Sequence, residues 1–318
     1  MAGTNYHAFT NKQYDSCVNC RMPETNQYFL TLTDGRKLSY ALYGPANGKP
    51  VFYFHGTPSS RLEPLLLNAH NKDLEQLLKQ YKVQLIAVDR PGMGLSTYNP
   101  HNSFQSFAGD VAQLATHLNI PAASVLGWSG AGPFALSLAF YYPALIRGVY
   151  LITGFTRSFS EDGVFKVMHA NKYYFGTARY APGLLRAVLN TVSRKPSDKP
   201  MPKWLSGLPE ADYQCMNTSE AIQQLSIVSI CESCINGSRG AVQEAALYFN
   251  PTGYNIAQMQ QPIHFWWGTV DNVVPAVHPK SIEVTAPNAT MHYKEGEGHL
   301  SIYIHYFEEV LETIAGLK

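Results

Sequence analysis

Short apolar segments alternate with helical segments along much of the chain, and this alternation limits the possible folds more than any other feature. The apolar segments are Val51–His55, Val83–Asp89, Ser124–Gly127 and Gly148–Thr153. Helical patterns separate them, at Arg61–Tyr81, Ser103–Leu118 and Gly130–Tyr142. Strands that are apolar on both faces and alternate with helices predict a parallel sheet covered by helices on both sides. The fold class is therefore α/β, with a mostly parallel sheet.

The alternation is preceded by a hairpin and interrupted once. Two β-rich runs flank the turn dipeptide Asp34-Gly35, which predicts an antiparallel hairpin over Tyr28–Gly44. Residues 155–258 give short helical patterns and many aromatic residues, and the strand–helix rhythm then resumes with Pro262–Gly268. Open α/β sheets bind ligands at the carboxyl ends of their strands, so this insertion is expected to form a helical cap there. We predict a polar tail at 1–27, a core at 28–154 and 259–318, and a cap at 155–258.

Charge and hydropathy exclude several classes of function. The chain has 24 Lys and Arg residues against 23 Asp and Glu, a net charge of +1, so it lacks the basic field that nucleic acid binding requires. No segment approaches the roughly 18 apolar residues of a membrane span. The first residues also lack the basic start and apolar run of a secretory signal. A cytoplasmic protein without a membrane span is expected, and its oligomeric state is open.

Five cysteines occur, an odd number that argues against a complete disulfide framework. Two pairs have the Cys-x-x-Cys spacing, Cys17 with Cys20 and Cys231 with Cys234. Zinc sites use such pairs, but normally close together, whereas these lie in different regions of the chain. We therefore expect no metal site, and interpret the second pair as two residues on one helix face.

One serine stands in a pattern typical of a nucleophile. Ser129 lies between an apolar strand and an apolar helix, in the sequence Gly-Trp-Ser-Gly-Ala from Gly127 to Ala131. A serine on a sharp strand-to-helix turn exposes its hydroxyl, and small neighbours leave room for the turn. The N–H of Gly130, at the start of that helix, is a candidate donor to a developing oxyanion.

Two further residues complete a possible triad. Asp271 follows a predicted strand directly, and His299 follows the last strand and opens the last helix. An imidazole can remove the serine proton and return it to a leaving group, and a carboxylate can fix the imidazole tautomer. Asp89, at the end of another strand, is an alternative acid, although pairing with Arg90 or a loop amide is the expected role.

The order Ser, Asp, His resembles that of the α/β-hydrolases, specifically the capped branch with proline iminopeptidase-like and esterase-like enzymes. The resemblance runs from about Tyr28 to the end of the chain and includes the sequences His-Gly-Thr-Pro, Asp-Arg-Pro-Gly-Met-Gly-Leu-Ser and Gly-Glu-Gly-His-Leu. It implies an α/β-hydrolase fold with an inserted helical cap. It also implies that Ser129 is the nucleophile, Asp271 the acid, His299 the base, and the Thr57 N–H the second oxyanion donor. His55 is then a residue that shapes its turn.

The resulting prediction is a serine hydrolase that cleaves a small or medium hydrophobic carboxylic ester through an acyl-enzyme. It needs no cofactor or metal, and its partner is a small hydrophobic molecule. Trp128, Phe155 and Phe159 are candidate residues of the substrate pocket. A serine at the elbow disfavours epoxide opening and halide removal, for which related capped enzymes use a carboxylate.

Two alternatives stay open. An amidase or aminopeptidase could use the same three residues, but proline iminopeptidases usually have Gly-Gly-Ser-Trp-Gly at the elbow and bind a free amine with cap carboxylates. The spacing of the acidic residues in 155–258 identifies no such clamp. A lyase or a ligand receptor could also retain the geometry without hydrolysis.

Overall fold

The computed structural model describes residues 27–197, 199 and 207–316. Its centre is an eight-stranded sheet with the strand order β1-β2-β4-β3-β5-β6-β7-β8. The strands are β1 (Tyr28–Thr31), β2 (Lys37–Tyr43), β3 (Lys49–Phe54), β4 (Val83–Val88), β5 (Ala123–Trp128), β6 (Ile146–Ile152), β7 (Ile263–Gly268) and β8 (Ala289–Lys294). The expected hairpin is present, because β1 and β2 pair antiparallel. β2 is also antiparallel to β4, whereas the six strands β3 to β8 run parallel to one another.

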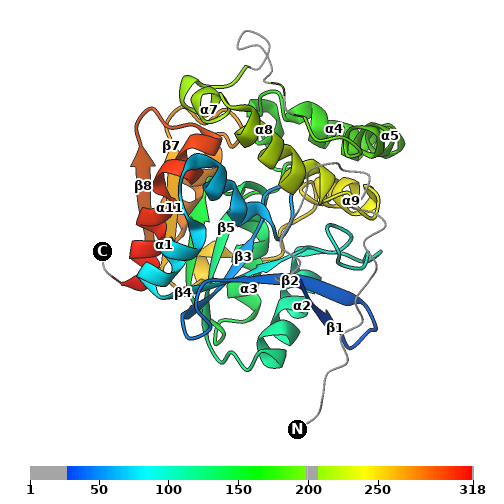
Figure 1. Ribbon diagram of the computed structural model, residues 1–318. Helices are drawn as coiled ribbons and strands as arrows, with labels where there is room; N and C mark the ends of the chain where they lie inside the picture. The colour runs from blue at the N-terminus through cyan, green and yellow to red at the C-terminus, as the bar shows by residue number, and fades with distance from the viewer. Residues whose placement is uncertain (1–26, 198, 200–206, 317–318) are drawn as a thin grey trace.

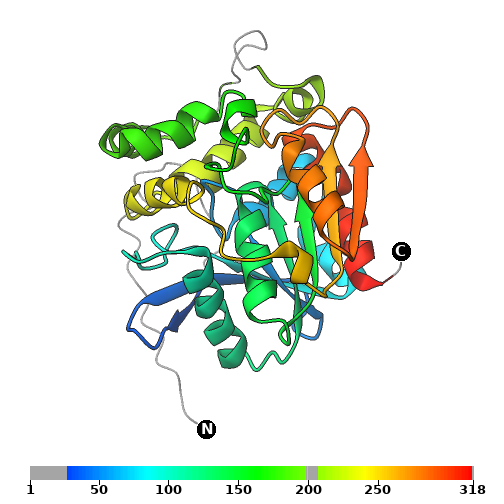
Figure 2. The same ribbon diagram turned by 180° about the vertical axis from the view of Figure 1, so that it is seen from behind.

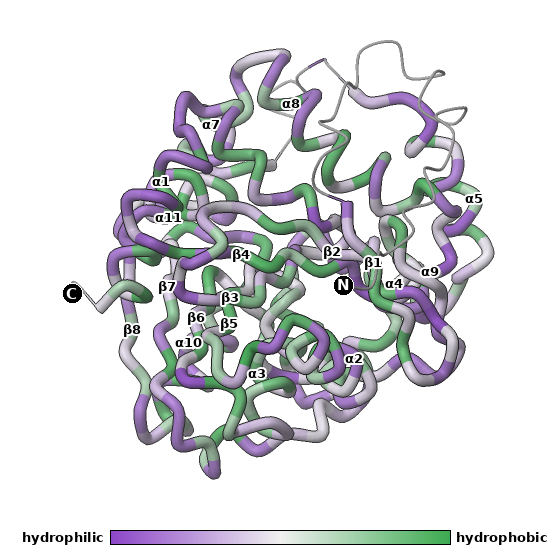
Figure 3. The backbone as a smooth tube through the Cα atoms, turned by 60° about the horizontal axis from the view of Figure 1, so that its bottom comes forward, coloured by the Kyte–Doolittle hydropathy of each residue, from purple (hydrophilic) through white to green (hydrophobic). Residues whose placement is uncertain are grey.

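Helices cover both faces of the sheet. Figure 1 shows α1 (Leu74–Tyr81) and α11 (His299–Ala315) over one face. Figure 2 shows α2 (Phe104–His117), α3 (Gly132–Tyr141) and α10 (Val277–Thr285) over the other. Each face of the sheet has its own buried apolar cluster. The strands contribute apolar side chains to both clusters, as a sheet covered on both faces requires. In Figure 3 the hydrophobic colour runs through central strands such as β4 and β5.

One predicted helix is broken. The pattern over Arg61–Tyr81 predicted a single helix, but the structure has the short helix η2 (Glu63–His70) followed by α1. Asn71 ends η2 in the left-handed conformation with φ of 58°, and the Asp73 side chain accepts a hydrogen bond from the Gln76 N–H to begin α1. Asn and Asp favour these positions, so the break has a local cause.

The segment 155–258, which we call the cap segment, lies between β6 and β7. It contains α4 (Lys172–Tyr180), α5 (Pro182–Val192), α7 (Glu210–Cys215), α8 (Ser219–Ser226) and α9 (Arg239–Leu247), with the short helices η4 (Phe165–Val167), η5 (Ile227–Cys231) and η6 (Ile256–Gln258). Figure 1 shows the larger helices together at one end of the sheet. The parallel strands of the sheet direct their carboxyl ends toward this side, where open α/β sheets bind their ligands.

The cap segment and the core approach each other closely, backbone to backbone, at Gly240 and Gly92. A Cβ atom on Gly240, at the start of α9, would overlap the carbonyl group of Gly92 in the loop after β4. Glycine is therefore required for this close approach. Within the described residues, no helix is both long enough and apolar enough to cross a membrane.

Candidate active site

Ser129 occupies a strained turn at the carboxyl end of β5. Its φ is 57°, in the left-handed region that residues other than glycine rarely adopt. The short helix η3 (Ser129–Ala131) follows at once and leads into α3. The Ser129 carbonyl accepts a hydrogen bond of 3.0 Å from the Phe155 N–H, which fixes the turn from the far side. This geometry is that of the strand-to-helix elbow expected from the sequence.

His299 and Asp271 are in direct contact. His299 Nδ1 lies 2.9 Å from Asp271 Oδ2, and both residues are buried. The other carboxylate oxygen of Asp271 accepts hydrogen bonds from the Val273 and Val274 N–H groups at 2.7 and 2.9 Å. One carboxylate oxygen of Asp271 is thus bound by the main chain, and the other binds the imidazole. This leaves Nε2 as the ring nitrogen available to another group.

Trp128 links the serine to the histidine. Its ring stacks on the His299 imidazole with centroids 5.3 Å apart, and its Nε1–H donates to the His299 carbonyl at 3.2 Å. Ser129 is the next residue along the chain. Since Ser129, Asp271 and His299 follow the carboxyl ends of β5, β7 and β8, which run parallel, the three residues lie at the same edge of the sheet.

The surroundings of His299 favour a protonated ring. Burial lowers the pKa of His299, but the Asp271 carboxylate, Asp212 and Glu63 together outweigh it, with Asp271 contributing most. The net pKa therefore lies above its usual value. A carboxylate that stabilises an imidazolium is what a general base needs when it takes a proton from an alcohol.

The two residues predicted to supply the oxyanion donors, Thr57 and Gly130, lie next to each other. A Cβ atom on Gly130 would overlap the Thr57 hydroxyl, so the loop after β3 closes directly over the elbow. The Gly130 carbonyl accepts a hydrogen bond of 2.7 Å from the Tyr248 hydroxyl. Within the part of the chain that the structure describes, the Thr57 N–H has no hydrogen-bond acceptor. A donor that stabilises a substrate oxyanion must be free in this way.

A buried polar network under this loop was not predicted. Arg90 is fully buried and donates to both oxygens of Glu244, which comes from α9 of the cap segment. Its guanidinium also donates to the carbonyls of His55 and Gly56. The Thr57 hydroxyl donates to Glu244 at 2.6 Å. Arg90 and Glu244 are more than 150 positions apart in the sequence. No local sequence pattern predicts such a pairing.

Glu63 is a second buried carboxyl group beside the elbow. It accepts hydrogen bonds from the Gly56 N–H at 2.8 and 2.9 Å and from the Tyr53 hydroxyl at 2.5 Å. Burial raises the pKa of Glu63 to about 7. Its charge state therefore changes near neutral pH.

Of the two partners expected for Asp89, the loop amide is present, in the Leu95 N–H at 3.0 Å, but the pairing with Arg90 is not. Asp89 instead pairs with Arg61 at 2.9 Å and accepts hydrogen bonds from the Arg61 and Leu95 N–H groups. Arg61 also contacts Glu232 of the cap segment at 2.6 Å. Arg90 turns the other way, toward Glu244. His55 is buried beside it and bonds to the Gly56 carbonyl at 2.8 Å, as expected of a residue that shapes the turn.

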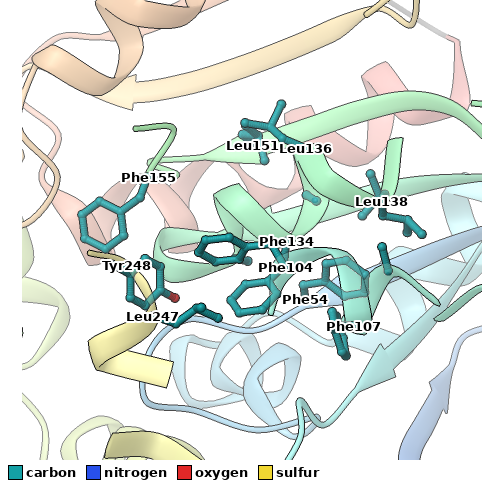
Figure 4. Close-up of a cluster of buried hydrophobic side chains, with 14 of the residues drawn as sticks. Phe54, Phe104, Phe107, Phe134, Leu136, Leu138, Leu151, Phe155, Leu247 and Tyr248 are labelled. Atoms are coloured by element: carbon teal, nitrogen blue, oxygen red, sulfur yellow. The ribbon is translucent and has the colours of Figure 1, made fainter. Parts of the chain in front are cut away.

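The three candidate pocket residues lie in different surroundings. Trp128 contacts His299, as described. Phe155 and Phe159 are 1% and 2% exposed and pack in an aromatic cluster with Tyr248 and Phe175. Figure 4 shows Phe155 beside Tyr248 in this cluster. The assignment of all three to a substrate pocket stays a prediction.

None of the three cysteines in the described residues belongs to this site. Cys17 and Cys20 lie outside the described residues. Cys215, Cys231 and Cys234 form no disulfide, with Cys231 at the end of η5 and Cys234 in the turn that follows. Among the residues that the structure describes, no group of His, Cys, Asp and Glu side chains could hold a metal ion.

Several solved structures share the fold. An esterase, RhEst1, from Rhodococcus sp. superposes with a TM-score of 0.63 at 22% identity, covering 92% of this chain and 99% of that one. A carboxylesterase from the thaumarchaeon Nitrososphaera gargenis superposes with a TM-score of 0.66 at 17% identity, covering 91% and 97%. At this identity the likeness concerns the fold.

The relatives found by sequence carry the names of different kinds of enzyme. A putative proline iminopeptidase from Mycoplasma genitalium is 29% identical over 129 residues, and a non-heme chloroperoxidase from Streptomyces lividans is 25% identical over 291 residues. The first alignment covers 39% of this chain and 38% of the relative, and the second covers 87% and 94%. The match thus spans less than two fifths of the iminopeptidase. The sequence profile of the alpha/beta hydrolase fold matches residues 49–306. The chain therefore belongs to the α/β-hydrolase fold family.

Proposed function

We propose that the protein is a serine hydrolase that cleaves a small or medium hydrophobic carboxylic ester through an acyl-enzyme. The observation that carries the proposal is the 2.9 Å contact of His299 with Asp271 at the sheet edge where Ser129 occupies its strained elbow. The esterases among the structural neighbours support it.

The proposed reaction has two halves. His299 Nε2 takes the Ser129 proton as the oxygen attacks the ester carbonyl, and Asp271 stabilises the imidazolium through Nδ1. The N–H groups of Thr57 and Gly130 stabilise the oxyanion, and His299 returns the proton to the departing alcohol. Water then attacks the acyl-enzyme with His299 as base. Deacylation regenerates the serine hydroxyl.

The buried acids of the cap segment weigh against the aminopeptidase alternative. An amine clamp of the proline iminopeptidase type needs cap carboxylates that face the substrate. Here Glu232 and Glu244 are bound to Arg61 and Arg90, and Asp212 accepts three main-chain N–H groups. These three carboxylates already have partners within the chain, so an amine would have to displace one of them.

The test uses p-nitrophenyl esters of short acyl chains. Wild-type protein is expected to release p-nitrophenol, and Ser129→Ala is expected to lower kcat by a factor of about 10⁶ because the nucleophile is lost. Ser137→Ala is the matched control, because Ser137 is a buried serine of α3 outside the triad. Equal turnover by wild type and Ser129→Ala would contradict the proposal.

Two further assays separate the alternatives. Turnover of proline β-naphthylamide in preference to all esters would favour the aminopeptidase. A fluorophosphonate probe followed by intact-mass analysis reports whether Ser129 is activated. An adduct that is absent from Ser129→Ala supports a serine hydrolase, whereas the absence of an adduct on wild type would favour the lyase or receptor.

A further inference from the structure

The helix that carries His299 begins with a cap supplied by another part of the chain. The first N–H groups of a helix have no acceptors within the helix. In α11 three of them donate to Asp212, the His299 N–H to Oδ2 at 2.8 Å and the Leu300 and Ser301 N–H groups to Oδ1 at 2.9 Å. Asp212 is only 1% exposed, so these bonds are shielded from water.

Asp212 belongs to α7 of the cap segment, 87 residues before His299. Figure 1 shows α7 close to the end of α11 at the edge of the sheet. The residue before His299 is Gly298, and a Cβ atom there would overlap the Asp212 carboxylate. Glycine therefore lets the carboxylate approach the helix end. The Gly298 N–H is satisfied separately, by the Ser301 hydroxyl at 2.8 Å.

Asp212 and Asp271 hold the same residue at different atoms. Asp271 binds the imidazole at Nδ1, and Asp212 binds the main-chain N–H of His299. The first contact orients the ring about its own bonds. The contact with Asp212 fixes the main chain of His299, to which the ring is attached. A rotation or a shift of the helix end would move Nε2 relative to Ser129 even with the contact to Asp271 intact.

We propose that Asp212 is a positioning residue for His299, by which the cap segment sets the place of the base of the proposed hydrolase. The proposal rests on the proposed function of Ser129, Asp271 and His299. It makes the cap segment part of the catalytic apparatus, in addition to any role in covering the substrate. Asp212 itself does not contact the reacting atoms.

The charge of Asp212 supplies a readout that a purely structural role would not. The charged groups that face His299 are Asp271 from the loop after β7, Asp212 from α7 and Glu63 from η2, and all three raise the pKa of His299. Neutralising Asp212 is therefore expected to lower the pKa of His299. Loss of packing alone would reduce stability without this shift.

The first variant is Asp212→Asn, which keeps the shape of the side chain. Its amide oxygen can still accept from Leu300 and Ser301, but its NH₂ group would face the His299 N–H and cannot accept from it. We expect kcat on a p-nitrophenyl ester to fall about tenfold with KM nearly unchanged. The acid limb of kcat/KM is expected to move to lower pH. Asp162→Asn is the matched control, because Asp162 is a fully exposed carboxylate of the same cap segment.

A second variant and a second measurement keep the test independent of folding and of turnover. Asp212→Ser retains a capping hydroxyl without the charge, and serves if Asp212→Asn does not fold. The pKa of His299 can be measured by NMR titration of its imidazole signal, assigned by its loss in His299→Gln. A lowered pKa in either neutral variant supports the proposal even if no ester is turned over, a result that would count against the proposed function alone. An unchanged His299 pKa, with or without a loss of stability, would overturn it.

Discussion

At the scale of single residues, the candidate site brings together carboxyl groups in different surroundings. Asp271 accepts two main-chain N–H groups and contacts a histidine that it helps to protonate. Glu63, beside the turn at Gly56, accepts hydrogen bonds from the Tyr53 hydroxyl and the Gly56 N–H, and its burial raises its pKa to about 7. Burial opposes the ionisation of a carboxyl group, which is why the pKa of Glu63 is raised.

Glu63 gives a prediction about stability and pH. Its pKa is about 7 in the folded chain against 4.5 in an unfolded one, so between these values only the folded state holds the proton. Below pH 4.5 the protonated Glu63 contributes about 3 kcal/mol to the free energy of unfolding. This contribution is lost as the pH rises through about 7. Urea unfolding of wild type and Glu63→Gln at pH 4.5 and 8 measures it.

The comparison isolates Glu63 because the other titrating groups are common to both proteins. Wild type is expected to lose more stability than Glu63→Gln as the pH rises. Parallel changes in the two proteins would show that Glu63 is already ionised at low pH in the folded state.

At the scale of elements, the glycine contact between α9 and the loop after β4 is a close backbone contact of the cap segment with the core. Gly240→Ala would place a methyl group on the Gly92 carbonyl, which is backbone and cannot rotate away. We expect a loss of about 1–3 kcal/mol in the free energy of unfolding. Gly183→Ala in α5 is the control, since a Cβ atom there meets nothing within 4 Å. Thermal unfolding of both variants would test this, and equal midpoints would contradict it.

The core elements were predictable because their signals are local. The apolar runs placed β3, β4, β5 and β7 within a residue or two of their ends, and the glycine-bordered serine and histidine fell at the strand ends where the structure has them. The break at Asn71 was missed because the leucine pattern continues across it. Asp212 and Glu244 could not be recognised among the acidic residues of the cap segment, because their partners are chosen by docking of distant elements rather than by spacing.

At the scale of the whole molecule, the cap segment and the core are joined by buried ionic contacts. The Arg90–Glu244 pair is completely buried and supports the carbonyls of the loop that carries Thr57. Buried pairs of this kind contribute little net stability when intact, but removing one partner leaves an uncompensated charge.

Glu244→Gln is therefore expected to lower the free energy of unfolding by about 3–5 kcal/mol. It should also reduce kcat on a p-nitrophenyl ester, because Arg90 would no longer be held beneath the oxyanion loop. Glu220→Gln, at an exposed position of α8, serves as the control and should leave both quantities unchanged. Chemical denaturation and steady-state kinetics give the two readouts. A variant as stable as wild type would show that the pair does not join cap and core.

The position of α11 also has a consequence for biosynthesis. Ser129 leaves the ribosome 170 residues ahead of His299, and β7 and β8 are made in between. Throughout that interval the nascent serine lacks the His299 imidazole. A chain that stalls or is cut before His299 during translation therefore carries a serine without its proposed base, and the proposed chemistry begins only after the residues up to α11 have been made.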